Sequence, residues 1–275
     1  MPAPLTGVRV VNASINLPAD VAGHRLAELG ACVTKVEPPQ GDPVAAASAD
    51  LYDELTRDQK IVVLDLTRED GRASLGALLA EADLLLTSSR PAALASFGLS
   101  WPDVGRRHPR LAHVAIVGHA APNQDLPGHD LTYAARQGLV APPAMPRTLM
   151  ADLAGAEQAV STALALLLGR AHGADRYAEV ALEHGAEVFA LPWRHRITTE
   201  DGPLGGANPF YRLYEAERGW VALAALEQRF RERVTSALGI DEVSVEAFAR
   251  VFRTRPADEW EQWAAELDIP LAAVR

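Results

Sequence analysis

The fold class is decided by residues 8–36, which read VRVVNASINLPADVAGHRLAELGACVTKV. A short β-branched run at Val8–Val11 is followed by a helical pattern from Pro18 to Leu29. Gly30 ends that helix, and a second strand-like run follows at Cys32–Val36. This order predicts a βαβ unit, in which the two strands lie parallel in one buried sheet.

The same alternation continues toward the C-terminus. Helices are predicted at Glu69–Ala82 and at Leu153–Arg170, the latter ending at His172-Gly173. Further strands are predicted at Ile61–Leu66, Leu84–Thr87, Ala112–Val117 and Tyr177–Leu182. The sequence therefore predicts an α/β fold with a Rossmann-like large domain and a mostly parallel sheet over residues 1–190.

The remaining residues predict a second, smaller domain. Residues 191–208 are rich in proline, glycine and charge, which is typical of a linker. Tyr211–Tyr214 and Trp220–Leu226 indicate a hairpin that turns near Arg218-Gly219. Amphipathic helices are predicted within Gln228–Leu238, Val245–Phe252 and Ala257–Leu267. Residues 209–275 are thus expected to form an α+β domain.

Charge and composition limit the possible partners. The formal net charge of the 275-residue chain is -10, which argues against binding to nucleic acid or to an anionic membrane surface. The most apolar stretch, Ala159–Leu168, is shorter than the ~20 residues that span a bilayer. The single cysteine, Cys32, and the lack of a signal-like N-terminus favour a cytoplasmic protein.

Common cofactor motifs do not occur in the sequence. It contains no G-x-x-x-x-G-K-[ST] phosphate loop, no G-x-G-x-x-G fingerprint and no G-x-S-x-G nucleophile elbow. Its eight histidines are not at zinc-ligand spacing, so no metal site is expected.

Three short segments could carry proton-transfer chemistry. His129 begins a helical run, Asp152 stands at the start of the longest predicted helix, and Glu227 ends an apolar strand. A histidine and a carboxylate can remove and return a proton near neutral pH. Each also has a structural explanation: Asp152 as a helix N-cap, His129 as a helix-start residue and Glu227 as a solvated strand end.

The order and context of these segments resemble family III coenzyme A transferases, and within them the α-methylacyl-CoA racemases. The resemblance runs from about residue 4 to the C-terminus. It is carried by the following segments: Pro4–Val10, Leu26–Pro43, Val63–Leu66, Gly71-Arg72, Pro127–Tyr133 (PGHDLTY), Ala151–Gly155 (ADLAG), Gly205–Tyr211 and Ala225–Glu227. It implies the family III fold and coenzyme A thioesters as substrates.

The resemblance also implies a role for each candidate residue. In the racemases, the residues matching His129 and Asp152 exchange a proton on opposite faces of the thioester α-carbon, and the acid matching Glu227 supports the histidine. In the transferases, the aspartate matching Asp152 becomes acylated and passes through an aspartyl-CoA thioester. Coenzyme A contacts are implied near Lys35, Val36, Lys60, Arg90, Asp130 and Tyr133.

Physical chemistry adds two expectations. Backbone N–H groups at the N-terminus of the Leu153–Arg170 helix are expected to face the thioester oxygen, and the helix dipole is expected to lower the pKa of Asp152. Racemisation of a 2-methyl-branched acyl-CoA is the leading hypothesis. Transfer of coenzyme A between carboxylates and a non-catalytic acyl-CoA-binding protein are the alternatives.

Several family positions have changed. The N-F-R-P-G segment reads Ser88–Ala92, the R-G-K-[RK] segment reads Arg57–Lys60, and the G-F-G turn reads Gly118-His119-Ala120. These changes predict altered coenzyme A binding. Because the chain stops at Arg275, where the family usually continues, we expect a homodimer that is either interlocked as in the family or assembled differently.

Overall fold

The computed structural model describes residues 2–170, 173 and 175–275, which form two compact units. The first unit runs to Ala190 and the second from Leu191 to Arg275. The predicted helix end at His172 lies outside the described residues. Each unit is built around its own apolar core.

The first unit contains a six-stranded sheet in which all neighbouring strands are parallel. Its strand order is β3-β2-β1-β4-β5-β6. The strands are β1 (Arg9–Ala13), β2 (Cys32–Glu37), β3 (Lys60–Val63), β4 (Leu84–Thr87), β5 (Ala112–Val117) and β6 (Tyr177–Ala181). The predicted α/β class is confirmed, and the strand order changes direction between β1 and β4.

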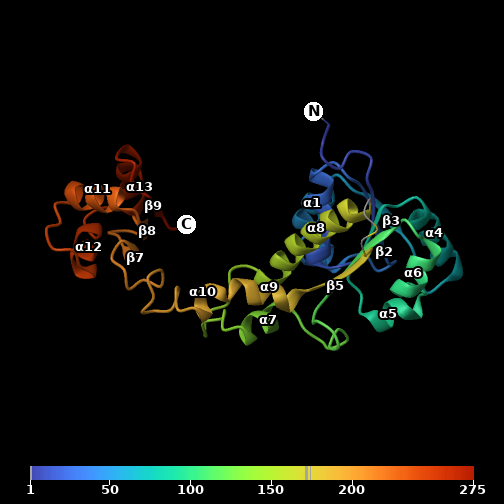
Figure 1. Ribbon diagram of the computed structural model, residues 1–275. Helices are drawn as coiled ribbons and strands as arrows, with labels where there is room; N and C mark the ends of the chain where they lie inside the picture. The colour runs from blue at the N-terminus through green and yellow to red at the C-terminus, as the bar shows by residue number, and fades with distance from the viewer. Residues whose placement is uncertain (1, 171–172, 174) are drawn as a thin grey trace. The chain divides into compact units, whose positions relative to one another are not determined.

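Helices cover both faces of this sheet (Figure 1). One face is covered by α1 (Leu17–Glu28) and α8 (Met150–Gly169), and the other by α4 (Glu69–Ala80), α5 (Pro91–Ser96) and α6 (Trp101–Arg107). Side chains alternate along β4, because Leu84 and Leu86 pack on the first face and Leu85 on the second. Short helices also occur at α2 (Pro43–Ala47), α3 (Ala49–Thr56), α7 (Asp130–Arg136) and α9 (Leu182–Phe189).

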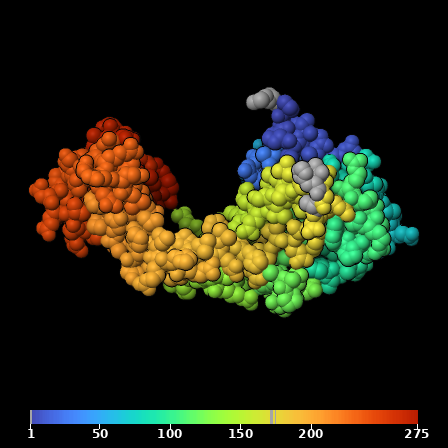
Figure 2. Space-filling model, in the orientation of Figure 1, coloured from blue at the N-terminus to red at the C-terminus, as the bar shows by residue number. Residues whose placement is uncertain are grey.

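The 20-residue α8 is longer than the apolar stretch that the sequence suggested, and its length and composition would allow it to cross a membrane. In this unit it packs against α1, α9 and β5. Small residues let the helices approach closely: Gly155, Ala156, Ala159 and Ala163 are all buried. One side of the helix is thus covered, with 33% of its most apolar window buried, and part of the yellow segment is exposed beside the blue N-terminal residues (Figure 2).

The second unit is a three-stranded antiparallel sheet packed on helices. The sheet has the order β7-β8-β9, and β9 (Leu271–Ala273) follows the predicted hairpin of β7 (Tyr211–Glu215) and β8 (Trp220–Ala224). The helices are α11 (Gln228–Leu238), α12 (Val245–Phe252) and α13 (Ala257–Glu266). Residues 191–208, predicted as a linker, include α10 (Leu191–Arg194) and a turn in which Leu204 N–H donates to the Ile197 carbonyl.

Candidate active site

A pocket of about 370 Å³ at the carboxyl ends of β4 and β5 contains both residues predicted to move protons. His129 and Asp152, 23 positions apart in the chain, line its wall together with Tyr133 and Arg90. We call this cavity the Asp152 pocket. Ligands of open parallel sheets bind outside the carboxyl ends of the strands, which is where this pocket lies.

The helix that carries Asp152 is capped by a different residue. Asp152 is the third residue of α8. Leu149, which directly precedes the first residue of the helix, makes no side-chain cap. The buried carboxylate of Asp130, at the start of α7, accepts the N–H groups of Ala151 (2.6 Å) and Asp152 (3.0 Å). The prediction that Asp152 is the N-cap is therefore wrong, and the side chain of Asp152 is left without a capping role.

The two hydrogen bonds accepted by Asp130 also bear on the prediction that N–H groups at the start of this helix face the thioester oxygen. Asp130 occupies the N–H groups of Ala151 and Asp152, and Leu153 N–H donates to the Leu149 carbonyl. These groups cannot also donate to a substrate oxygen. Asp130, predicted to contact coenzyme A, instead positions α8 beneath Asp152.

Burial raises the pKa of Asp152 to about 6, and the negative charge of Asp130 adds to this effect, whereas His129 opposes it. The prediction that the helix N-terminus lowers this pKa is wrong. A helix dipole contributes about 0.3–1 kcal/mol at an exposed site, which desolvation and a like charge outweigh here.

His129 directly precedes α7 and is exposed. Its main chain is fixed by Thr132, whose hydroxyl accepts the His129 N–H (3.1 Å) and donates to the His129 carbonyl (2.7 Å). The exposed ring lines the Asp152 pocket, where a bound molecule can reach it.

Tyr133 forms the buried wall of the pocket and is 2% exposed. Its hydroxyl lies against Gly118 and Gly128, and a Cβ atom at either glycine would collide with it. Burial, followed by the charges of Asp152 and Glu183, raises the pKa of Tyr133. The phenol consequently stays protonated and can donate a hydrogen bond.

The two predicted coenzyme A contacts on β2 differ in their surroundings. The Lys35 side chain is fully buried and its Nζ pairs with Asp20 and with Asp42 (2.7 Å), so this side chain cannot reach a bound molecule. Val36 is 4% exposed within the core under α4, but it is among the residues that line a hollow at the carboxyl edge of the sheet. The contact of Val36 with coenzyme A stays a prediction.

The other predicted contacts are dispersed. Arg90 is exposed at the Asp152 pocket, whereas Lys60 is exposed on the edge strand β3 and does not line it. Glu227 belongs to the second unit, at the N-cap position of α11. Its support of His129 stays a prediction.

A neighbouring hollow of about 280 Å³ contains one residue predicted to contact coenzyme A, Val36. It lies at the carboxyl ends of β1, β2 and β3, where Ser14, Pro38 and Leu66 are also among its lining residues. It and the Asp152 pocket therefore flank the β1–β4 switch point of the sheet.

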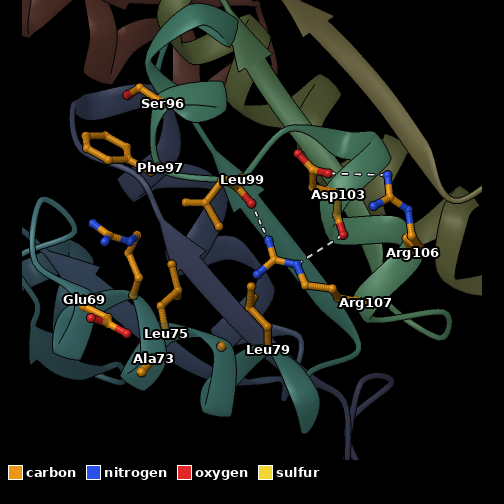
Figure 3. Close-up of a pocket in the computed structure, with 13 residues that line it drawn as sticks. Glu69, Ala73, Leu75, Leu79, Ser96, Phe97, Leu99, Asp103, Arg106 and Arg107 are labelled. Atoms are coloured by element: carbon orange, nitrogen blue, oxygen red, sulfur yellow. Dashed lines mark hydrogen bonds and ion pairs between the residues drawn. The ribbon is translucent and has the colours of Figure 1, made fainter.

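A larger hollow, about 680 Å³, lies between α4, α5 and α6 and contains none of the predicted site residues (Figure 3). Its guanidinium groups are already engaged: Arg107 donates to the carbonyls of Gly98 and Asp103, and Arg106 pairs with the Asp103 carboxylate. Size therefore does not identify the site. Across the described part of the chain, no group of three or more His, Cys, Asp or Glu could hold a metal ion.

Comparison with known proteins identifies the family. Residues 5–275 match CoA-transferase family III, and the chain belongs to this family of enzymes. It is 27% identical to cinnamoyl-CoA:phenyllactate CoA-transferase of Clostridium sporogenes, over 97% of this chain and 77% of that protein. It is 30% identical to the probable fatty acyl-CoA transferase Rv3272 of Mycobacterium tuberculosis, over 98% of this chain and 77% of the relative.

Solved structures agree on the fold. The crystal structure of Rv3272 matches with a TM-score of 0.86 and 22% identity, covering 100% of this chain and 86% of that one. A CaiB/BaiF family protein from Brucella suis matches with a TM-score of 0.81 and 20% identity, covering 100% and 85%. The resemblance to family III coenzyme A transferases is confirmed, and coenzyme A thioesters are the substrates that the family implies.

Proposed function

We propose that this enzyme transfers coenzyme A between two carboxylic acids, with Asp152 as the nucleophile. One observation carries the proposal: the Asp152 carboxylate lines an open pocket and forms no ion pair with any described residue. The names of the two relatives, both transferases, favour this chemistry over racemisation.

The reaction can be written with all bonds balanced. The Asp152 carboxylate attacks the donor thioester carbonyl, the C–S bond breaks, and a mixed anhydride and a coenzyme A thiolate result. The thiolate attacks the Asp152 carbonyl, which releases the donor acid and leaves an aspartyl-CoA thioester. The acceptor carboxylate then repeats the two steps in reverse, which forms the new acyl-CoA and regenerates Asp152.

The environment of Asp152 suits a nucleophile. A carboxyl group with a pKa of about 6 is mostly ionised at pH 7, yet it is more basic than an ordinary aspartate. Tyr133 is the donor on the pocket wall that we assign to the thioester oxygen, because the N–H groups of Ala151 and Asp152 are occupied.

The neighbouring hollow offers room for the nucleotide part of coenzyme A. It shares the carboxyl edge of the sheet with the Asp152 pocket, and its walls carry apolar side chains, including Ile15, Leu64 and Leu66. Arg90, at the rim of the Asp152 pocket, is the residue we assign to a phosphate group. Lys60 stays a predicted contact.

Trapping tests the transferase proposal directly. The enzyme is incubated with cinnamoyl-CoA, succinyl-CoA or a fatty acyl-CoA in the presence of hydroxylamine, and peptides are mapped by mass spectrometry. We expect a hydroxamate at Asp152 and none in an Asp152→Asn control. A donor that binds and is consumed while Asp152 stays unmodified would overturn the proposal.

Racemisation remains a second candidate because the exposed His129 lines the same pocket as Asp152. A racemase needs a proton carrier on each face of the α-carbon. Incubation of a chiral 2-methylacyl-CoA in D₂O distinguishes the reactions. Racemisation predicts α-deuteration and inversion that both require His129, whereas transfer leaves the α-hydrogen in place.

The predicted assembly and location are also part of this proposal. We propose a homodimer in the cytoplasm, because the family resemblance implies paired chains and the composition fits a reducing compartment. Analytical ultracentrifugation at several protein concentrations measures the oligomeric state, and a single monomer peak throughout would refute the dimer.

A further inference from the structure

A pair formed by a buried histidine, His119, and a half-buried carboxylate, Glu183, lies next to the Asp152 pocket. His119 follows β5 and is 2% exposed, and its Nδ1 is 2.7 Å from Oε2 of Glu183. Glu183, in the first turn of α9, also accepts the Ala120 N–H at 2.7 Å through its other oxygen. The Glu183 N–H in turn donates to the Gly118 carbonyl (3.2 Å). The carboxylate therefore clamps the turn that forms part of the pocket wall.

The hydrogen bonds of Glu183 determine the orientation of the His119 imidazole. Burial alone would raise the pKa of Glu183, but the bonds from Ala120 and His119 lower it overall, so this carboxylate is ionised at neutral pH. The ionised carboxylate accepts a hydrogen bond from Nδ1–H, which holds the imidazole in one orientation. Nε2 of His119 is buried and has no hydrogen-bond partner among the described residues. The ring is thus held from one side only.

The held ring touches the pocket through Tyr133. The rings of His119 and Tyr133 meet edge to face, with centroids 5.2 Å apart and an interplanar angle of 83°. Tyr133 is the pocket-wall phenol whose hydroxyl sits in the slot between Gly118 and Gly128. A displacement of the imidazole would therefore displace the phenol.

We infer that Glu183 and His119 form a positioning pair that holds the Tyr133 hydroxyl where it donates to the thioester carbonyl oxygen. The inference rests on the proposed coenzyme A chemistry and deepens it. The two residues act through Tyr133 and need not touch the substrate. Misplacing a donor by about 1 Å can cost up to ~10²-fold in rate, so orientation of this phenol is a sizeable effect.

Kinetics provide the first test. His119→Phe keeps a ring of similar size without the bond to Glu183, and Glu183→Gln keeps an acceptor without the charge. We expect kcat for transfer from cinnamoyl-CoA to phenyllactate, or from another donor that labels Asp152, to fall roughly tenfold in each variant while KM changes little. Combined with Tyr133→Phe, neither variant should lower kcat further, since the group through which they act is gone.

A matched control separates this effect from a general loss of packing. His113, on β5, is buried like His119 and is 1% exposed. It forms a hydrogen bond with Thr87 (2.8 Å) and does not line the Asp152 pocket. His113→Phe should leave kcat unchanged even if it lowers the thermal midpoint. An equal fall in kcat for His113→Phe would overturn the inference.

A binding experiment makes the result independent of turnover. In an Asp152→Asn background, which cannot form the covalent intermediates, the affinities for acetyl-CoA and for free coenzyme A are compared by calorimetry. Only acetyl-CoA carries a thioester carbonyl. The ratio of its affinity to that of free coenzyme A, expected to be about fivefold to tenfold, therefore measures the Tyr133 contact. His119→Phe should reduce that ratio when Tyr133 is present and have no effect beside Tyr133→Phe.

The outcomes distinguish the two proposals. If the affinity ratio of acetyl-CoA to coenzyme A depends on His119 but no hydroxamate forms at Asp152, the positioning pair is supported and the transferase mechanism is refuted. If Asp152 is labelled but His119→Phe lowers kcat equally with and without Tyr133→Phe, only the positioning pair is refuted. Failure of both acetyl-CoA and coenzyme A to bind would overturn both.

Discussion

Burial raises the pKa values of two aspartates in the first unit, the buried Asp20 and the half-buried Asp152, but the two residues have different roles. Burial raises the pKa of Asp20 to about 7 and that of Asp152 to about 6. Asp20 is sealed in the core and paired with Lys35, beside Asp42 and Glu37. Asp152 faces a cavity, and its nearest charged neighbours are an acid and an exposed histidine. A perturbed carboxyl group indicates chemistry only where a substrate can reach it.

The largest expected effect separates the two sites by activity. Asp152→Asn should lower transferase activity by about 10³-fold or more, because it removes the proposed nucleophile. Its stability should be unchanged or slightly higher, since the substitution relieves repulsion from Asp130. Activity assays and urea unfolding measure the two effects. Retention of even a tenth of the wild-type rate would rule out Asp152 as the nucleophile.

Lys35→Met should show the opposite pattern. Removing the one cation leaves Asp20 and Asp42 buried without compensation, and breaking such a pair costs about 3–5 kcal/mol of unfolding free energy. Lys60→Met, on the adjacent strand β3 and exposed, is the matched control and should change stability little. Equal stabilities of the two variants would contradict a structural role for Lys35.

The pH dependence of activity sharpens the comparison further. Asp152 has a folded-state pKa of about 6, so its nucleophilic, deprotonated form is lost as the pH falls through 6. We expect kcat/KM to be level above about pH 7 and to drop roughly tenfold per unit below about pH 5.5. Stopped assays across buffers of constant ionic strength measure the profile. A midpoint near 4 would contradict a raised pKa of Asp152 in the free enzyme.

The smallest effect concerns the residue beneath Asp152. Asp130→Asn keeps an acceptor for the α8 N–H groups but removes the charge, which should cost about 1 kcal/mol of stability. It should also lower the pKa of Asp152 and shift the pH–activity midpoint downward, because the Asp130 charge raises that pKa. Asp70→Asn, at the exposed start of α4, serves as the control and should shift neither quantity. An unmoved midpoint in Asp130→Asn would exclude electrostatic coupling between the two acids.

Much of the fold could be predicted because its signals are local. Leu84–Thr87 and Ala112–Val117 are strands at the predicted bounds, and Gln228–Leu238 is a helix at its predicted bounds. Each has a clear hydrophobic period or a run of buried residues. The five-residue helix α2 and the three-residue strand β9 were missed, since each is too short to show a hydrophobic period.

The site was predicted less completely. His129 and Asp152 were found through their segments, and the structure places both at one pocket. Lys35 was misassigned because a lysine on a strand carries no sign of whether its ammonium meets solvent or two buried acids. His119 was noted only as a change in a turn, and its partner Glu183 lies 64 positions away. No local pattern could have joined them.

By itself, the sequence determined the alternation of strands and helices, the boundary region between two units and the two residues that could exchange protons. Periodicity and residue type are local properties, and they express which segments bury one face. The tertiary structure alone decided that Asp130 caps α8, that the pKa of Asp152 rises and that Glu183 holds His119. Those outcomes depend on groups distant in the chain meeting in a medium of low dielectric constant, where burial and a single neighbouring charge outweigh the preferences of a helix end.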